Sequence, residues 1–138
     1  MSFLVDTNVI SELRKGARCH AGVRHWFDGV DSEEIFLSVI LIAEIRRGIE
    51  SIRRRDRTSA TRLDRWLREI SRVHEGRILP VDVRIAEEWG RMNVPDPIPV
   101  LDGLMAATAR VHNLTLVTRN VKDVQRTGIQ ILNPFEMV

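Results

Sequence analysis

The chain has 138 residues, of which 43% are hydrophobic and 29% charged, so it is long enough to bury a core and lacks the composition of a disordered chain. Its first residues do not have the layout of a signal peptide, and no apolar run approaches the length of a membrane span, so no membrane association is expected. Cys19 is the single cysteine, which excludes an internal disulfide and favours a reducing compartment, so we expect a cytoplasmic protein.

The first half of the chain alternates short strands with amphipathic helices. Ser38 is a good N-cap, and apolar residues recur at helical spacing after it. The expected elements are a strand at 3–5, a helix from 7 to about 13, a helix carrying Val23, Trp26, Phe27 and Val30, a strand at 34–37, a helix with Ile42, Ile45, Ile49 and Ile52 on one face, and a helix from about 58 to 73 with Leu63, Trp66, Leu67 and Ile70 inward.

The second half continues the alternation. The expected elements are a strand or extended piece at 78–81, a helix capped by Asp82, a loop forced by Pro95, Pro97 and Pro99, a buried helix from Asp102 to about 112, a strand at 114–117, a short turn or helix through 124, and a strand at 129–132. This order predicts one α/β domain over residues 1–138, a three-layer α/β/α arrangement with a short, mostly parallel central sheet.

The positive charge is almost all arginine. The net charge is only +2, yet arginines crowd one stretch, namely Arg46, Arg47, Arg53, Arg54, Arg55, Arg57, Arg62, Arg65, Arg68, Arg72 and Arg77. Guanidinium groups suit phosphate, so the stretch predicts a surface for a polyanion. The alternative is a solvated helical face whose arginines pair with Asp56, Asp64, Glu69 and Glu75.

Four acidic residues stand where strands end or helices begin. They are Asp6, Glu44, Asp102 and Asp123, with Asn120 close before the last. The carboxyl ends of parallel strands share one edge of a sheet, so these remote positions can meet there. Crowded carboxylates repel one another, and a hard divalent cation such as Mg²⁺ relieves the repulsion.

Local explanations exist for each acid taken alone. Asp6 and Asp102 can cap the helices that follow them, and Glu44 can form a surface bridge with Arg47 three residues on. Asp102 also lies among apolar neighbours, where an unpaired charge is costly. One shared cation explains all four positions together.

The motifs resemble those of PIN-domain ribonucleases, and above all the VapC toxins of toxin–antitoxin pairs. The residues that carry the resemblance are Leu4-Val5-Asp6-Thr7-Asn8, Ala43-Glu44-Ile45, the segment from Asp102 to Ala109, and Val117-Thr118-Arg119-Asn120 with Asp123. Two further segments, 76–80 and 132–135, are similar to those of the FitB-like branch. The match spans nearly the whole chain in the order typical of the family.

The resemblance implies a PIN-like fold and hydrolysis of RNA by a water molecule activated by Mg²⁺, with Mn²⁺ as a substitute. Asp6, Glu44 and Asp102 would then be metal-site acids, with Asp123 as the fourth. Thr7, Asn8 and Thr118, together with Asn120, would orient the carboxylates or water. Asn120 stands where the family often has Asp, so either Asn120 or Asp123 fills the fourth place, and Leu41 replaces a hydroxyl residue common in relatives.

The resemblance also implies partners. We expect a VapB-type antitoxin that inserts a segment into the acidic groove, a homodimer built from helical faces, and contact with operator DNA only indirectly, through the antitoxin. RNA would be the substrate, held by phosphate contacts from the arginine-bearing helices.

Two other functions remain open on the sequence. One is a catalytically decayed PIN-like module that acts only through the antitoxin and DNA, with Asn120 as the mark of decay. The other is a phosphoacceptor receiver domain, which is also a parallel α/β domain with clustered acids. A receiver needs a lysine near a late strand end, and Lys122 follows its strand by several residues.

Overall fold

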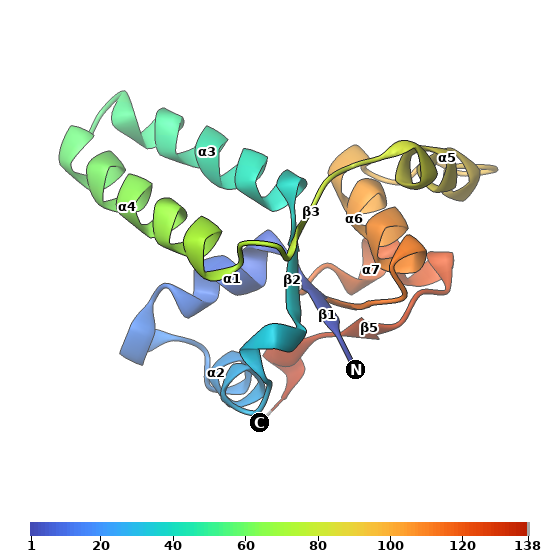
Figure 1. The fold of residues 1–138 in the computed structure, drawn as a ribbon, viewed down its shortest axis with the longest axis horizontal. Coiled ribbons are helices and arrows are strands. Elements are labelled where there is room, and N and C mark those ends of the chain that lie inside the picture. The colour runs from blue at the N-terminus through green and yellow to red at the C-terminus, as the bar shows by residue number, and fades with distance from the viewer. Residues whose placement is uncertain (138) are drawn as a thin grey trace.

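The structure is a computed structural model that describes residues 1–137, with helices on both faces of one sheet (Figure 1). The strands are β1 (Phe3–Val5), β2 (Ile35–Ser38), β3 (Ile78–Leu79), β4 (Thr115–Val117) and β5 (Ile131–Leu132). The helices are α1 (Thr7–Leu13), α2 (Ala21–Asp28), α3 (Val39–Arg53), α4 (Arg57–Val73), α5 (Val83–Met92), α6 (Val100–Val111) and α7 (Val121–Val124). Short 3₁₀ turns lie at Gly16–Arg18, Ser32–Glu34, Gln125–Thr127 and Pro134–Glu136. The predicted three-layer α/β/α fold is confirmed.

The sheet places β1 at its centre. The strand order is β3-β2-β1-β4-β5, and each neighbouring pair is parallel, with Phe3 opposite both Ile35 and Thr115. The chain runs from β1 outward on one side and later returns to the other side through β4. In an open parallel sheet, such a reversal of strand order opens a crevice at the carboxyl ends of the strands, where ligands bind. Asp6 directly follows β1 and therefore lies at this switch point.

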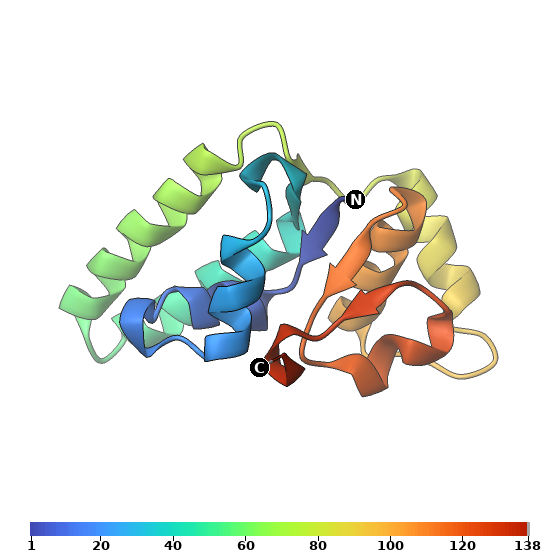
Figure 2. The same ribbon diagram turned by 90° about the horizontal axis from the view of Figure 1, so that it is seen from below.

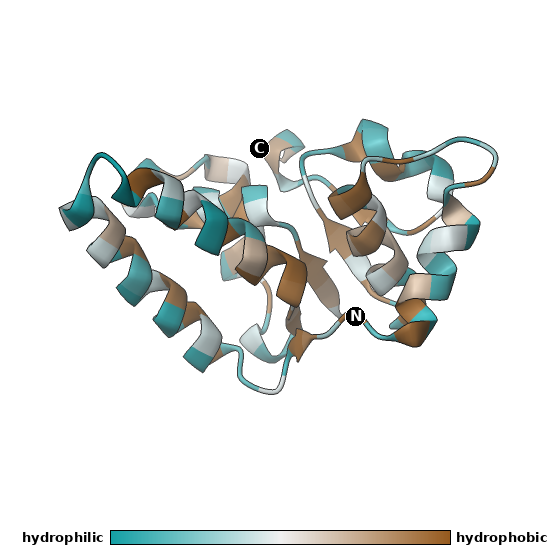
Figure 3. Cartoon of the chain, turned by 90° about the horizontal axis from the view of Figure 1, so that it is seen from above, coloured by the Kyte–Doolittle hydropathy of each residue, from teal (hydrophilic) through white to brown (hydrophobic). Residues whose placement is uncertain are grey.

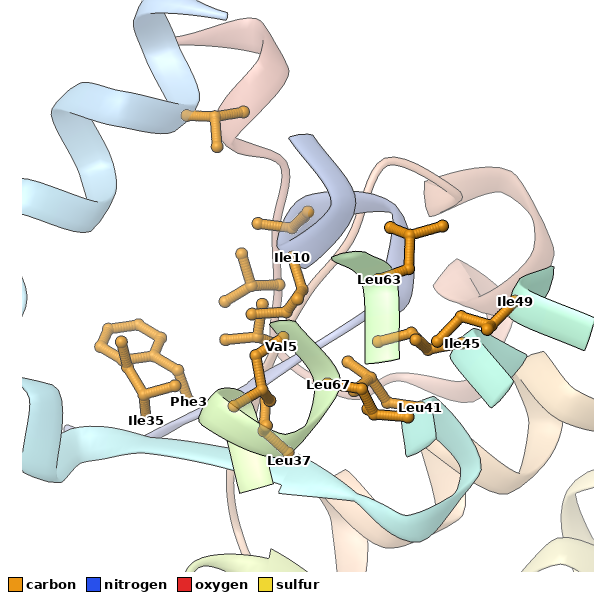
Figure 4. Close-up of a cluster of buried hydrophobic side chains, with 14 of the residues drawn as sticks. Phe3, Val5, Ile10, Ile35, Leu37, Leu41, Ile45, Ile49, Leu63 and Leu67 are labelled. Atoms are coloured by element: carbon orange, nitrogen blue, oxygen red, sulfur yellow. The ribbon is translucent and has the colours of Figure 1, made fainter. Parts of the chain in front are cut away.

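The alternation of side chains along β1 divides the core into two clusters. Phe3 and Val5 point to one face and pack with Leu37 against α1, α2, α3 and α4 (Figure 4). Leu4 points to the other face and packs with Leu116 against α5, α6 and α7. Because successive residues of a strand face opposite sides, three residues of one strand anchor both helical layers.

The α3–α4 hairpin extends away from the sheet, as Figures 1 and 2 show, while α5 and α6 pair on the opposite side. The buried residues of α4 recur at helical spacing and are Ala60, Leu63, Leu67 and Ile70. The outer side of α4 is strongly hydrophilic in Figure 3. The hairpin therefore buries one stripe of each helix and presents its arginine-rich side to solvent.

Several predicted boundaries shift. The buried helix begins at Val100, not at Asp102, because Pro99 occupies its N-cap with φ −49°, a value that proline favours. Asp102 therefore lies in the first turn of α6, and the capping interpretation of this residue is wrong. The strands β3 and β5 are shorter than predicted, and β3 stops before Pro80, which has no backbone N–H for a ladder. Among the described residues, no helix is both long and apolar enough to cross a membrane.

Candidate metal and active site

Asp6 is buried at the end of β1, with 6% of its surface exposed, and three groups donate hydrogen bonds to its carboxylate. The backbone N–H of Thr7 donates to Oδ1 at 2.8 Å. The hydroxyl of Thr118 donates to Oδ2 at 2.7 Å, and the amide of Asn8 donates to the same oxygen at 3.3 Å. Capping of α1 thus accounts for one oxygen of Asp6, while the other is held by a residue from the far end of the chain.

The Thr118 hydroxyl is the centre of this network. Besides donating to Asp6, its Oγ1 accepts from the Asn8 amide at 3.3 Å and from the backbone N–H of Asn120 at 3.0 Å. A hydroxyl has one donor and two acceptor positions, so this fully buried group is saturated. Asn8 in turn accepts from the backbone N–H of Arg119 at 3.2 Å. Thr118 and Asn8 therefore fix the ends of β1 and β4 against each other.

Glu44 reaches the same region from α3. Its Oε1 accepts a hydrogen bond from the Thr7 hydroxyl at 2.7 Å, which joins α3 to α1. Within residues 1–137, Arg47 forms no ion pair with Glu44, so the surface-bridge interpretation is wrong. Glu44 is instead oriented by Thr7 of α1, which the sequence predicted as a neighbour of the site.

Asp102 lies where the negative charges of the other three acids act on it. Burial, followed by the charges of Asp6 and Asp123, raises the pKa of this carboxyl to about 6. A hydrogen bond with Asp123 and the charge of Glu44 act in the same direction. The structure thus brings four acids from separate segments to one edge of the sheet.

The four carboxylates are not arranged as a complete metal-coordination site. Among residues 1–137, no group of three or more Asp, Glu, His or Cys side chains is arranged to hold an ion. Their chemistry nevertheless suits a hard divalent cation, since every donor is a carboxylate oxygen. Burial is the main cause of the raised pKa of Asp102, and the negative charges of the neighbouring acids act in the same direction.

Asn120 and Asp123 take different positions, although both follow β4. Asn120 is exposed, and in the described chain its only contact with the network is its backbone N–H to Thr118. Asp123 lies in the first turn of α7, and its carboxyl reaches Asp102. Of these two candidates, Asp123 is therefore the fourth acid that meets the others.

The sequence interpretation overlooked Gly103. A Cβ at this position would lie 3.0 Å from Nε1 and 3.1 Å from Cδ1 of Trp89, closer than side chains normally pack. The missing side chain lets the Trp89 ring pack against α6 directly after Asp102. A glycine that follows a candidate ligand inside the first helical turn was the signal available in the sequence.

Comparisons with known proteins agree with this geometry. A family model described as PIN domain matches residues 3–129. The chain is 32% identical over 138 residues to "VapC ribonuclease Y4jK" of Sinorhizobium fredii, covering 96% of this chain and 97% of the relative. It is 31% identical over 137 residues to "Toxin FitB" of Neisseria gonorrhoeae, with coverage of 96% and 97%.

The fold is also similar to a solved structure, the crystal structure of FitAcB from Neisseria gonorrhoeae. The TM-score is 0.89 at 30% sequence identity, and the match covers 98% of this chain and 99% of the other. Sequence and fold therefore agree along almost the whole length of both chains. The chain belongs to the PIN domain family and, within it, to the VapC toxins, on the branch that includes FitB.

Proposed function

We propose that this protein is a Mg²⁺-dependent endoribonuclease and the toxin component of a type II toxin–antitoxin system. The observation that carries the proposal is the convergence of Asp6, Glu44 and Asp123 on Asp102; together with burial, which contributes most, their charges raise the pKa of that carboxyl to about 6. Membership of the PIN family and similarity to relatives named ribonuclease and toxin support the same activity. They favour it over the receiver-domain alternative.

Asp6, Glu44, Asp102 and Asp123 would hold the cation, with Mn²⁺ as a substitute for Mg²⁺. When bound, the cation would lower the pKa of an attacking water molecule and neutralise charge on the scissile phosphate. The protein's own residues supply orientation. Thr118 and Asn8 hold the Asp6 carboxylate, and Thr7 holds Glu44. Such outer partners keep ligands in register at metal sites.

RNA would be held partly by the arginines of α3 and α4. Arg46 and Arg53 are tied to Glu50 and Asp64, and Arg72 is tied to Glu69, so the paired-face alternative explains these three. Seven exposed arginines form no ion pair within residues 1–137, namely Arg47, Arg54, Arg55, Arg57, Arg62, Arg65 and Arg68. Free guanidinium groups on a helical surface suit contacts to RNA phosphates that do not depend on base sequence.

The partners are proposed on the family relationship. A VapB-type antitoxin would cover the acidic groove, two toxin chains would form a homodimer, and operator DNA would be reached only through the antitoxin. We further propose that residues 1–138 act as one domain and work in the cytoplasm. Co-expression with the short neighbouring gene expected for an antitoxin tests the first of these partners.

The decisive experiment compares the native chain with Asp102→Asn and Asp6→Asn. Induced expression of the native chain should arrest growth, and the purified protein should cut RNA with Mg²⁺ but not after chelation. Both variants should lose cleavage while their circular dichroism spectra stay native. Asp28→Asn is the matched control, because Asp28 is an exposed carboxylate of α2 whose one ion pair within residues 1–137 is with Arg24 at 3.6 Å. Unchanged cleavage by the Asp6 and Asp102 variants would defeat the proposal.

The same experiment separates the decayed-module alternative. A native chain that folds, binds its antitoxin and cuts no RNA in the presence of Mg²⁺ or Mn²⁺ would favour decay. The contact of Asp123 with Asp102 argues against it, because Asp123 would supply, one helical turn later, the carboxylate that Asn120 lacks.

A further inference from the structure

Three flat side chains, those of Arg119, Phe135 and His20, lie in contact beside the acidic edge of the sheet. The guanidinium carbon of Arg119 lies 4.4 Å from the centre of the Phe135 ring. The His20 ring lies 5.3 Å from the same Phe135 ring, centre to centre, at 57°. Arg119 lies two residues after β4, Phe135 lies in the last 3₁₀ turn, and His20 is the N-cap of α2. A cation over an aromatic face within about 6 Å is an attractive arrangement.

Backbone hydrogen bonds of Arg119 and Phe135 hold these two residues in place beside the candidate site. The N–H of Arg119 donates to Asn8 at 3.2 Å, and the preceding residue, Thr118, donates to Asp6. Phe135 is held from the other side, because its N–H donates to Asn133 at 3.0 Å and its ring packs against the core cluster. Arg119 is therefore one residue away from the group that orients the Asp6 carboxylate.

The charge of Arg119 is not used inside the described chain. The residue is exposed, and within residues 1–137 its guanidinium forms no ion pair, in contrast to Arg46 and Arg53. The guanidinium lies over the Phe135 ring, and within residues 1–137 its N–H groups donate no hydrogen bond. A guanidinium restrained in this way loses little conformational entropy when it binds a phosphate.

We propose that Arg119, restrained by Phe135, binds a phosphate of single-stranded RNA next to the scissile bond. The inference rests on the ribonuclease function proposed above and adds a substrate contact to it. The acids repel the RNA backbone, so a cation beside them is needed to hold the strand in place. Arginine side chains that stack and also contact phosphates are typical of single-strand recognition.

The test measures binding and cleavage separately. Binding of a labelled single-stranded RNA to the native full chain is followed by fluorescence anisotropy in EDTA, where no cleavage occurs, over a series of salt concentrations. Arg119→Ala should bind about tenfold more weakly, and the slope of log affinity against log salt should fall by about 0.7, the value for one lost phosphate contact to a single strand. Arg119→Lys should keep most of the slope.

Two further variants complete the design. Phe135→Leu should weaken binding less than Arg119→Ala, and the double variant should bind no more weakly than Arg119→Ala alone, because both changes disturb one contact. Arg84→Ala removes the same charge from the first turn of α5, where Arg84 lies 3.9 Å from Asp82, and should leave affinity and slope unchanged. With Mg²⁺, Arg119→Ala should raise KM about tenfold and change kcat by less than threefold.

The outcomes separate the two proposals. If the native chain cuts RNA but Arg119→Ala keeps the native affinity and salt slope, this inference is wrong and the ribonuclease function stands. A lower melting temperature with an unchanged slope would show a structural role and would also overturn it. If the native chain neither binds nor cuts RNA, both proposals fail.

Discussion

The Thr118 hydroxyl donates a hydrogen bond of 2.7 Å to Oδ2 of Asp6, although the two residues are 112 positions apart in the chain. Both residues are buried, and the bond joins the carboxyl ends of β4 and β1. The two central strands thereby set the direction of the first candidate metal ligand.

Replacing Thr118 with Val should remove the hydrogen bond that orients Asp6 while keeping the shape of the side chain. The change leaves the backbone N–H of Asn120 without its partner and removes the shorter of the two hydrogen bonds to Oδ2 of Asp6, since the Asn8 amide still donates at 3.3 Å; the cost should be about 1 to 3 kcal/mol in the free energy of unfolding. Cleavage should fall by about 10- to 100-fold, as for other outer partners of metal ligands. Urea unfolding and cleavage assays measure both effects. Thr118→Ser keeps the hydroxyl and should stay close to native; equal losses in the two variants would contradict the prediction.

Thr7→Val should act on Glu44 with little effect on stability. The Thr7 hydroxyl donates to Glu44 at 2.7 Å, but the residue is only half-buried, so its loss should cost no more than about 1 kcal/mol. Cleavage should nevertheless fall about tenfold, because Glu44 loses the group that orients it. Cleavage rates of Thr7→Val and Thr7→Ser at saturating Mg²⁺ provide the measurement. A native rate in the Val variant would show that the bond plays no part in catalysis.

The raised pKa of Asp102 predicts how stability depends on pH in a metal chelator. In the folded chain the pKa is about 6, against an ordinary value of 3.8, so the folded state binds this proton more tightly than the unfolded state does. As pH rises from 3.8 to about 6, the free energy of unfolding should therefore fall, and Asp102→Asn should be free of this loss. Because the group is partly solvated, the difference at pH 7 should be about 1 kcal/mol.

Denaturant unfolding of the native chain and Asp102→Asn between pH 4 and 7.5 checks the sign. Asp28→Asn, which removes an exposed carboxylate, should follow the native curve. Added Mg²⁺ should restore the stability of the native chain at pH 7 more than that of Asp102→Asn, since a ligand stabilises the state that binds it. A native chain that becomes more stable than the variant as pH rises in EDTA would contradict the assignment.

Gly22→Ala should destabilise the protein through the backbone. A Cβ on Gly22 would lie within 2.5 Å of the carbonyl oxygens of Met137 and Pro134. Both are backbone atoms, so they cannot move away as the end of a flexible side chain can. We expect a loss of about 1 to 3 kcal/mol, as for other overpacked sites. Gly90→Ala, whose Cβ meets no atom within 4 Å, should instead be neutral or stabilising by about 0.5 to 1 kcal/mol. Thermal melts of both variants measure the contrast, and equal melting temperatures would refute it.

Much of the fold was predictable because local patterns and tertiary packing agree. The helical spacing of Leu63, Leu67 and Ile70 predicts the buried face of α4, and Ser38 caps α3 through a 3.0 Å bond to the N–H of Ile40, as expected. The start of α6 was not predictable from its capping residues, since Pro99 occupies the N-cap without a side-chain bond. Strand ends shifted because each strand extends only as far as its neighbours pair with it.

The sequence by itself was enough to predict which residues form the candidate site. The positions of Asp6, Glu44, Asp102 and Asp123 after strands or in the early turns of helices predict a shared edge, because parallel strands end on one side of a sheet. Only the tertiary structure decided how these side chains are held. Thr118 donates to Asp6, Thr7 to Glu44, and Asp123 meets Asp102 while Asn120 offers only its backbone. Periodicity and spacing specify a residue's place along its own element, but hydrogen bonds between elements depend on strand order and helix packing, which arise from the whole chain at once.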